Sequence, residues 1–188
     1  MKTLEIGSGL EPCQAREGEE VVHLDCQPLP HVEQVWDLDK FPYPFEDNSF
    51  DRIVATDVLE HMKDVRRTVE ELWRIAKPGA DISVRVPYWS SFRAHRDPTH
   101  HSFFDEHTFD YFGTSKLSYY SAARLNVLSI TEEETYPRLF GLLRRLAPRL
   151  ERGIKKHFLN MVLSLSFELQ VVKPPVVSGD FGDSELVQ

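Results

Sequence analysis

Short apolar runs alternate with polar stretches along the first half of the chain. Runs rich in β-branched residues and bounded by Gly, Pro or Asp are typical of strands, and they occur at residues 4–6, 21–24, 32–36, 50–56 and 82–86. Between the last two runs, apolar residues recur at helical spacing from Val65 to Ala76. Asp64 can cap this helix and Pro78-Gly79 should end it. The alternation predicts an α/β fold with a mostly parallel, doubly wound sheet, which binds ligands at the carboxyl ends of its strands.

The second half of the chain predicts two more strands with a helical insertion between them. The strands are expected at residues 124–134 and 167–172. Between them, apolar residues at near-helical spacing predict helices over about 137–160. Pro148 and Gly153 should split this insertion into two short helices.

Composition narrows the function classes. With 188 residues, of which 41% are hydrophobic, the chain can bury one core, so we expect a single domain over 1–173 and a loose or partner-docked tail over 174–188. The net charge of -8 argues against a nucleic-acid partner, because polyanion binding needs clustered Lys and Arg. Cys13 and Cys26 suggest no disulfide framework, and no apolar stretch approaches the roughly 20 residues that span a bilayer. We therefore expect a cytoplasmic protein.

The sequence LEIGSG, residues 4–9, joins an apolar strand to a two-glycine turn. Glycine lets the backbone adopt positive φ and approach a ligand closely. Asp25 ends the second apolar run, where a nucleoside-binding sheet needs a carboxylate to accept the ribose hydroxyl protons. Together these features suggest a nucleoside cofactor, whereas the glycines alone equally fit an ordinary tight turn.

From Leu4 to Pro87 the chain resembles the class I methyltransferases that use S-adenosylmethionine. The matching pieces, in the family's order, are LEIGSG, HLDC, WDLDKFPYPFEDNSFD, RIVATDVLEHM and ELWRIAKPGADISVRVP. The resemblance implies a Rossmann-like, seven-stranded, mostly parallel sheet that ends in an antiparallel hairpin. It also implies S-adenosylmethionine as cofactor and S-adenosylhomocysteine as product.

The resemblance assigns the first cofactor motif to the turn after the first strand. This motif consists of Glu5, Gly7, Ser8 and Gly9, with the loop backbone beside the methionine part of the cofactor. Asp25 would hold the ribose.

Further cofactor positions follow the later strands. Cys26 would lie beside the adenine, while Asp37 and Leu38 would contact its edge and face. The methionine and substrate side would be lined by Asp57, Leu59 and His61.

One departure from the family concerns the first crossover. Only Leu10 to Glu20 is available for it, and Pro12 and Gly18 interrupt this stretch, so the usual helix must be missing or very short. In this the chain resembles a compact subgroup in which a short GxxP loop replaces that helix. The loss should leave an open face on the sheet that a second subunit could cover, which makes a homodimer a candidate assembly.

Residues 87–104 form a second dense constellation, directly after the fifth strand. His95, Asp97, His100 and His101 are the catalytic candidates, because imidazole can take a proton from an attacking hydroxyl or amine near neutral pH. The same four side chains could instead bind a divalent metal such as zinc, iron, manganese or nickel. A third interpretation is a capped turn whose polar groups satisfy the loop. We favour the substrate-side role.

The basic, leucine-rich stretch 138–158 could contact an anionic membrane surface or a lipid-linked substrate. Amphipathic helices more often cover a core or a dimer seam, so both interpretations stay open.

The leading hypothesis is a methyltransferase acting on a small molecule or glycan, at oxygen, with a histidine base. One alternative uses the same cofactor for cyclisation or lyase chemistry, with a metal at the histidines. Another is a non-catalytic module that only binds the nucleoside, motivated by the shortened cofactor loop.

Overall fold

The computed structural model describes residues 1–113 and 119–174. Its strands are β1 (Lys2–Ile6), β2 (Glu20–Asp25), β3 (Gln34–Val35), β4 (Phe50–Thr56), β5 (Ala76–Pro87), β6 (Leu125–Glu134) and β7 (Val162–Val171). Its helices are η1 (Leu59–His61), α1 (Val65–Ile75), α2 (Phe92–Arg96), η2 (Thr108–Phe112), α3 (Pro137–Leu146) and α4 (Pro148–His157). Of the tail predicted over 174–188, residues 175–188 lie outside the described residues.

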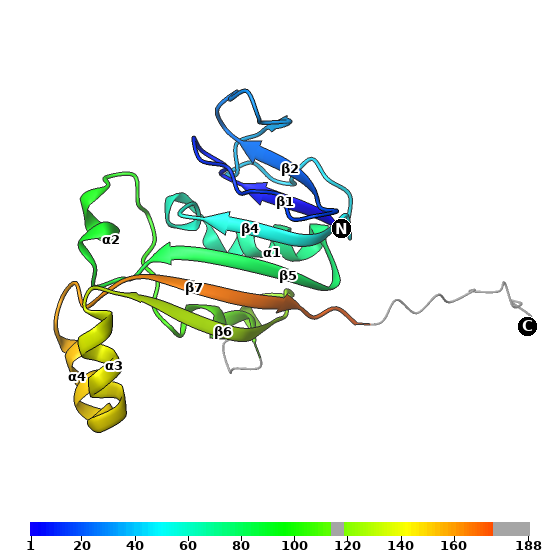
Figure 1. The fold of residues 1–188 in the computed structure, drawn as a ribbon. Helices are drawn as coiled ribbons and strands as arrows, with labels where there is room; N and C mark the ends of the chain where they lie inside the picture. Colours follow the sequence, from blue (N-terminus) through cyan, green and yellow to red (C-terminus); the bar gives the residue numbers. More distant parts are fainter. Residues whose placement is uncertain (114–118, 175–188) are drawn as a thin grey trace, which may run out of the picture.

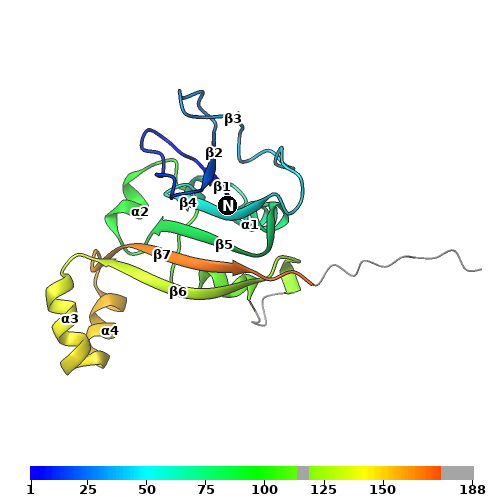
Figure 2. The same cartoon turned by 45° about the vertical axis from the view of Figure 1, so that its right-hand side comes forward.

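All the strands join one seven-stranded sheet of order β3-β2-β1-β4-β5-β7-β6 (Figure 1). Strands β1 to β5 pair in parallel, and β7 runs antiparallel to both of its neighbours. The expected Rossmann-like sheet with a C-terminal antiparallel hairpin is confirmed. Because β7 is reversed, the carboxyl ends of β4, β5 and β6 meet at one edge, where α2 and the α3–α4 pair also lie (Figures 1 and 2).

Helix α1 begins as expected, because the Asp64 side chain accepts a hydrogen bond from the backbone N–H of Arg67 at 2.9 Å. Its expected end at Pro78-Gly79 is wrong. The backbone becomes extended at Ala76, which is fully buried and pairs with Phe50 of β4. Burial and strand pairing therefore end the helix before the proline, and Pro78-Gly79 lies inside β5.

The described residues 7–19 contain no helix, which confirms the prediction that the first crossover helix is missing or very short. The expected open face is not found at β1. Its Thr3 and Glu5 side chains are 0% and 4% exposed, because Thr3 bonds to Glu19 and Glu5 bonds to Cys13 of the short loop. Polar contacts from the loop thus cover the face of β1 that was expected to be open.

The helical insertion is split at Pro148, which starts α4, as expected. The second break at Gly153 is wrong, since this residue lies within α4. One glycine costs a helix only about 1 kcal/mol, which the neighbouring turns outweigh. Within the described residues, no helix is both long enough and apolar enough to cross a membrane.

Candidate cofactor and acceptor site

The loop after β1 is built around Gly7. Its φ of 63° lies in the left-handed region, and its N–H donates to the Leu24 carbonyl at 2.8 Å. A Cβ atom at this position would lie 2.5 Å from Cγ2 of Val58, which follows β4. Both the backbone angle and the close packing therefore require glycine here.

Asp25 at the end of β2 holds this loop from the other side. Its carboxylate accepts the backbone N–H of Gly9 at 2.9 Å and that of Gln27 at 2.8 Å, and the residue is 8% exposed. Each carboxylate oxygen takes one of these bonds and retains a second acceptor position. The carboxylate is thus fixed in place and can still accept ribose hydroxyl protons.

Glu5, predicted as part of the first motif, is used to anchor the loop. Its carboxylate accepts the backbone N–H of Cys13 at 2.9 and 3.1 Å and faces Nδ1 of His23 at 2.8 Å. The residue is buried, so these partners occupy its oxygens away from solvent. Burial, reinforced by the Glu5 charge, raises the pKa of the Cys13 thiol to about 11.

The predicted adenine contacts divide into surface and core positions. Cys26 and Asp37 are exposed after β2 and β3, and burial of part of the Cys26 side chain raises its thiol pKa. Leu38 lies in the hydrophobic core, and its carbonyl accepts the Tyr43 hydroxyl at 3.0 Å. Ser8 of the first motif contacts the ring of His31 through Oγ at 3.2 Å.

The turn after β4 brings together the predicted methionine-side residues. Asp57 has a left-handed φ of 50°, and its carboxylate pairs with Arg85 at 3.0 Å. Leu59 is fully buried in the core, and His61 is half-buried. Asp57 and His61 are therefore the side chains of this turn that solvent reaches.

Sequence reasoning missed Glu60, which lies between them in η1. The side chain is 2% exposed, and burial raises its pKa to about 7. Its backbone carbonyl accepts the N–H groups of His101 at 2.7 Å and Ser102 at 3.2 Å. The loop after α2 therefore covers Glu60, which the local sequence LEHM does not indicate.

The predicted catalytic residues do not form one cluster. His95 is exposed and its Nε2 bonds to the Trp89 carbonyl at 2.8 Å, whereas His101 presents an exposed side chain. Asp97 accepts both the N–H and the hydroxyl of Thr99, at 2.9 and 2.7 Å, which lowers its pKa and makes it the cap of a turn. His100 instead lies against Glu60, with Nε2 4.0 Å from Oε1.

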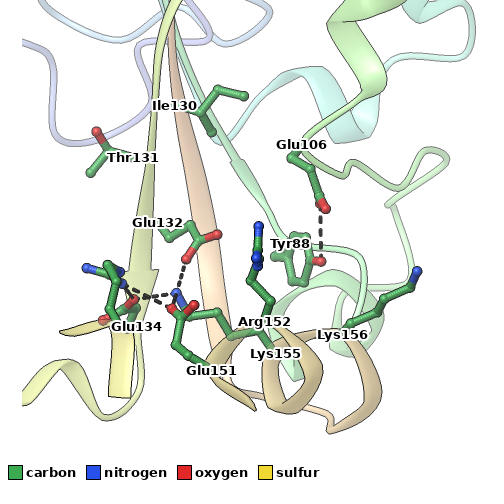
Figure 3. Close-up of a pocket in the computed structure, with 11 residues that line it drawn as sticks. Tyr88, Glu106, Ile130, Thr131, Glu132, Glu134, Glu151, Arg152, Lys155 and Lys156 are labelled. Atoms are coloured by element: carbon green, nitrogen blue, oxygen red, sulfur yellow. Dashed lines mark hydrogen bonds and ion pairs between the residues drawn. The ribbon is translucent and has the colours of Figure 1, made fainter. Parts of the chain in front are cut away.

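A pocket of about 690 Å³ lies at the same edge of the sheet, between β6 and α4 (Figure 3). Tyr88, which follows β5, lines it and donates its hydroxyl proton to Glu106 at 3.3 Å. On the opposite side, Lys155 is surrounded by three carboxylates; the set is Glu132, Glu134 and Glu151. Burial opposes the charge of Lys155, but its three acidic partners outweigh that cost and raise its pKa.

Residues 5–84, which contain the glycine loop, Asp25 and the β4 turn, match the family model described as a methyltransferase domain. This segment is similar to methyltransferase domains, and the sheet has the fold of class I S-adenosylmethionine-dependent methyltransferases. The chain is 35% identical over 79 residues to the chloroplastic tocopherol O-methyltransferase of Arabidopsis thaliana, a match that covers 42% of this chain and 22% of that protein. The chain thus matches about a fifth of the length of that relative.

Solved structures share the fold of this chain at low sequence identity. A SAM-dependent methyltransferase from Archaeoglobus fulgidus has a TM-score of 0.61 and 18% identity, over 90% of this chain and 85% of that chain. The [4+2]-cyclase SpnF has a TM-score of 0.55 and 13% identity, over 92% of this chain and 75% of that chain.

S-adenosylmethionine, the cofactor of the methyltransferases that the chain resembles, fits the residues present. Gly7 has a left-handed φ and no room for a side chain beside Val58, so the tight turn after β1 requires glycine, as a close approach of the backbone to a ligand also does. Asp25 supplies a buried, fixed carboxylate with acceptor positions to spare. These features fit a nucleoside cofactor although the first crossover helix is missing.

Proposed function

We propose that this protein is a methyltransferase that transfers a methyl group to an oxygen atom of a small molecule or glycan. The observation that carries the proposal is the Asp25 carboxylate, held by the N–H groups of Gly9 and Gln27. When bound, S-adenosylmethionine supplies a methyl group already activated on a sulfonium, so the protein has only to bind, align and deprotonate. In this proposal Asp25 accepts the ribose hydroxyl protons, and the backbone of Gly7 to Gly9 borders the methionine part.

His95 is the side chain best suited to remove the acceptor proton. Its Nε2 faces the Trp89 carbonyl at 2.8 Å, and a carbonyl can only accept, so Nε2 carries the proton and Nδ1 keeps the lone pair. His95 belongs to α2, and its side chain is exposed at the carboxyl edge of the sheet. An acceptor hydroxyl could therefore reach Nδ1 without rearrangement of the loop.

Exposed apolar residues near this edge favour an acceptor with an apolar part. Leu139, Leu142, Leu146 and Leu150 of α3 and α4 are between 51% and 71% exposed. Both helices also carry arginines and lysines at their ends, which suits an anionic lipid surface or a lipid-linked acceptor. The same leucines would also suit the interface of a homodimer, which we propose as an alternative to a lipid contact. We propose a cytoplasmic location for the protein.

A second candidate function is a different reaction on the same fold. The [4+2]-cyclase SpnF shares the architecture, so the fold does not by itself fix the chemistry. Release of S-adenosylhomocysteine with an acceptor would support transfer, whereas release of methylthioadenosine would support cyclisation or lyase chemistry. Cofactor binding without either product would support a nucleoside-binding module.

The direct test is calorimetric titration of the protein with S-adenosylmethionine and, separately, with S-adenosylhomocysteine. Asp25→Asn places an amide N–H against a backbone N–H and removes the charge, so we expect binding weakened by about 1–3 kcal/mol. That loss corresponds to roughly 5- to 150-fold in Kd. Asp81→Asn, at an exposed position in β5, is the matched control and should bind like the wild type. Equal affinity of the two variants, both shown to be folded, would contradict the assigned ribose contact.

A further inference from the structure

Three potential metal ligands converge at the carboxyl end of β4. Glu60 and His61 belong to η1, and His100 comes from the loop after α2. One ligand atom from each residue lies within 4.8 Å of the other two. The rings of His61 and His100 are 4.6 Å apart in an edge-to-face arrangement. Two segments far apart in sequence thus bring two imidazoles and a carboxylate to one point.

The hydrogen bond of His100 fixes which of its nitrogens is free. Nδ1 lies 3.0 Å from the Ala94 carbonyl, which can only accept, so we assign the proton to Nδ1. Nε2 then carries the lone pair, and this is the atom that lies 4.0 Å from Oε1 of Glu60. An N–H bonded to a backbone carbonyl is the usual way in which proteins orient a metal-ligating histidine.

His61 is oriented by a longer chain of bonds. The hydroxyl of Thr99 donates its proton to Asp97 at 2.7 Å, so its oxygen must accept from Nδ1 of His61, at 2.9 Å. This leaves the lone pair of His61 on Nε2. The Asp97 turn therefore acts through Thr99 as a support for His61, in the way that an outer carboxylate supports a ligand.

Glu60 provides a second observation that does not depend on this arrangement of ligand atoms. Its Oε2 is buried and has no hydrogen-bond partner among the described residues. Burying a carboxylate oxygen without a hydrogen-bond partner costs folding free energy, and native folds normally provide such a partner. At the other carboxylate cluster of this fold the chain supplies its own cation, since Lys155 lies 2.6 Å from Glu151.

We propose that Glu60, His61 and His100 bind a first-row divalent transition-metal ion. Two neutral imidazoles and one carboxylate suit manganese, iron, cobalt, nickel or zinc, and three protein ligands leave coordination positions open. Of the four side chains predicted from the sequence, only His100 is a ligand; Asp97 has a supporting role, while His95 and His101 lie outside the cluster. The inference concerns metal binding alone and does not depend on the proposed methyl transfer.

The test uses Co²⁺ as the probe, on the full chain stripped with EDTA and without added cofactor. Calorimetry and the visible absorption of the cobalt ion should both show one bound equivalent. Glu60→Gln, which keeps the shape of the side chain, and His100→Ala should each weaken binding by at least about 10-fold. His101→Ala removes the neighbouring exposed imidazole and should bind cobalt like the wild type.

Circular dichroism and thermal unfolding would establish that each variant is folded, and His61→Ala at the half-buried ring replaces any variant that is not. The proposal is overturned if the wild type shows no saturable cobalt binding. It is equally overturned if the folded ligand variants bind as tightly as His101→Ala. Separate titration with S-adenosylmethionine distinguishes either failure from a failure of the cofactor site.

Discussion

Replacing Gly7 with alanine should destabilise the fold through two separable costs. The first is the left-handed backbone, φ 63°, which costs an L-residue about 1–2 kcal/mol. The second is steric, because the new Cβ would lie 2.5 Å from Cγ2 and 2.8 Å from Cβ of Val58. Val58 is 7% exposed and cannot move away freely, so overpacking should add about 1–3 kcal/mol.

Gly9 provides the matched control for the backbone cost. Its φ is 53°, but a Cβ there would find its nearest atom only at 3.9 Å. Gly9→Ala should therefore lose about 1–2 kcal/mol, and Gly7→Ala about 2–5 kcal/mol. Urea unfolding with unchanged m-values measures both.

A double-mutant cycle identifies the partner in the clash. Val58→Ala removes Cγ2 but leaves the Cβ atom at 2.8 Å, so it should recover part of the steric cost in the Gly7→Ala background. If Gly7→Ala lowers the free energy of unfolding by no more than Gly9→Ala does, the loop does not pack against Val58. The reasoning that close packing requires glycine at position 7 would then be refuted.

Two further predictions concern charged groups at the carboxyl edge of the sheet. Lys155→Met leaves three carboxylates without their shared cation, so it should lower the free energy of unfolding, measured with urea, by about 3–5 kcal/mol. The control Lys156→Met, at an exposed position, should change this free energy by no more than about 0.5 kcal/mol. The hydrogen bond from Arg93, and after it the contact with Arg85, lowers the pKa of Glu133 in the folded protein. The ionised carboxylate therefore stabilises the fold above its unfolded pKa of about 4.5, and this stabilisation is lost as the pH falls through the lower folded pKa. Glu133→Gln should accordingly be less stable than the wild type at neutral pH, and unfolding curves at decreasing pH should show the difference closing; a constant difference would contradict this assignment.

Local patterns were sufficient to predict most of the sheet. The apolar run Phe50–Thr56 and the cap at Asp64 were predicted at the observed positions, because each depends on neighbouring residues alone. The end of α1 was not, since Ala76 leaves the helix to pair with Phe50, a contact that no local pattern reveals. Helix α2 was also missed, because its five residues are too few to show a period.

The candidate site likewise contains residues that a local motif predicts and residues that depend on long-range contacts. Gly7 and Asp25 stand at strand ends, where a short motif indicates their use. Glu60 gave no such signal, because its burial arises only when the loop carrying His101 and Ser102 folds over η1. The histidines after β5 were visible in the sequence, but which of them meets Glu60 depends on a bond from His100 to Ala94 within that loop.

The way in which the loop between β1 and β2 is held determines which substitutions its sequence tolerates. Its anchors to Asp25 and Glu5 are backbone N–H groups, those of Gly9 and Cys13, and neither bond involves a side chain of the loop. At position 13 these bonds exclude proline, which has no N–H to donate, and the half-buried position next to the Glu5 carboxylate also disfavours a second acid. Related chains would be expected to differ widely at position 13 while keeping the two acids, which are the partners that the loop cannot replace.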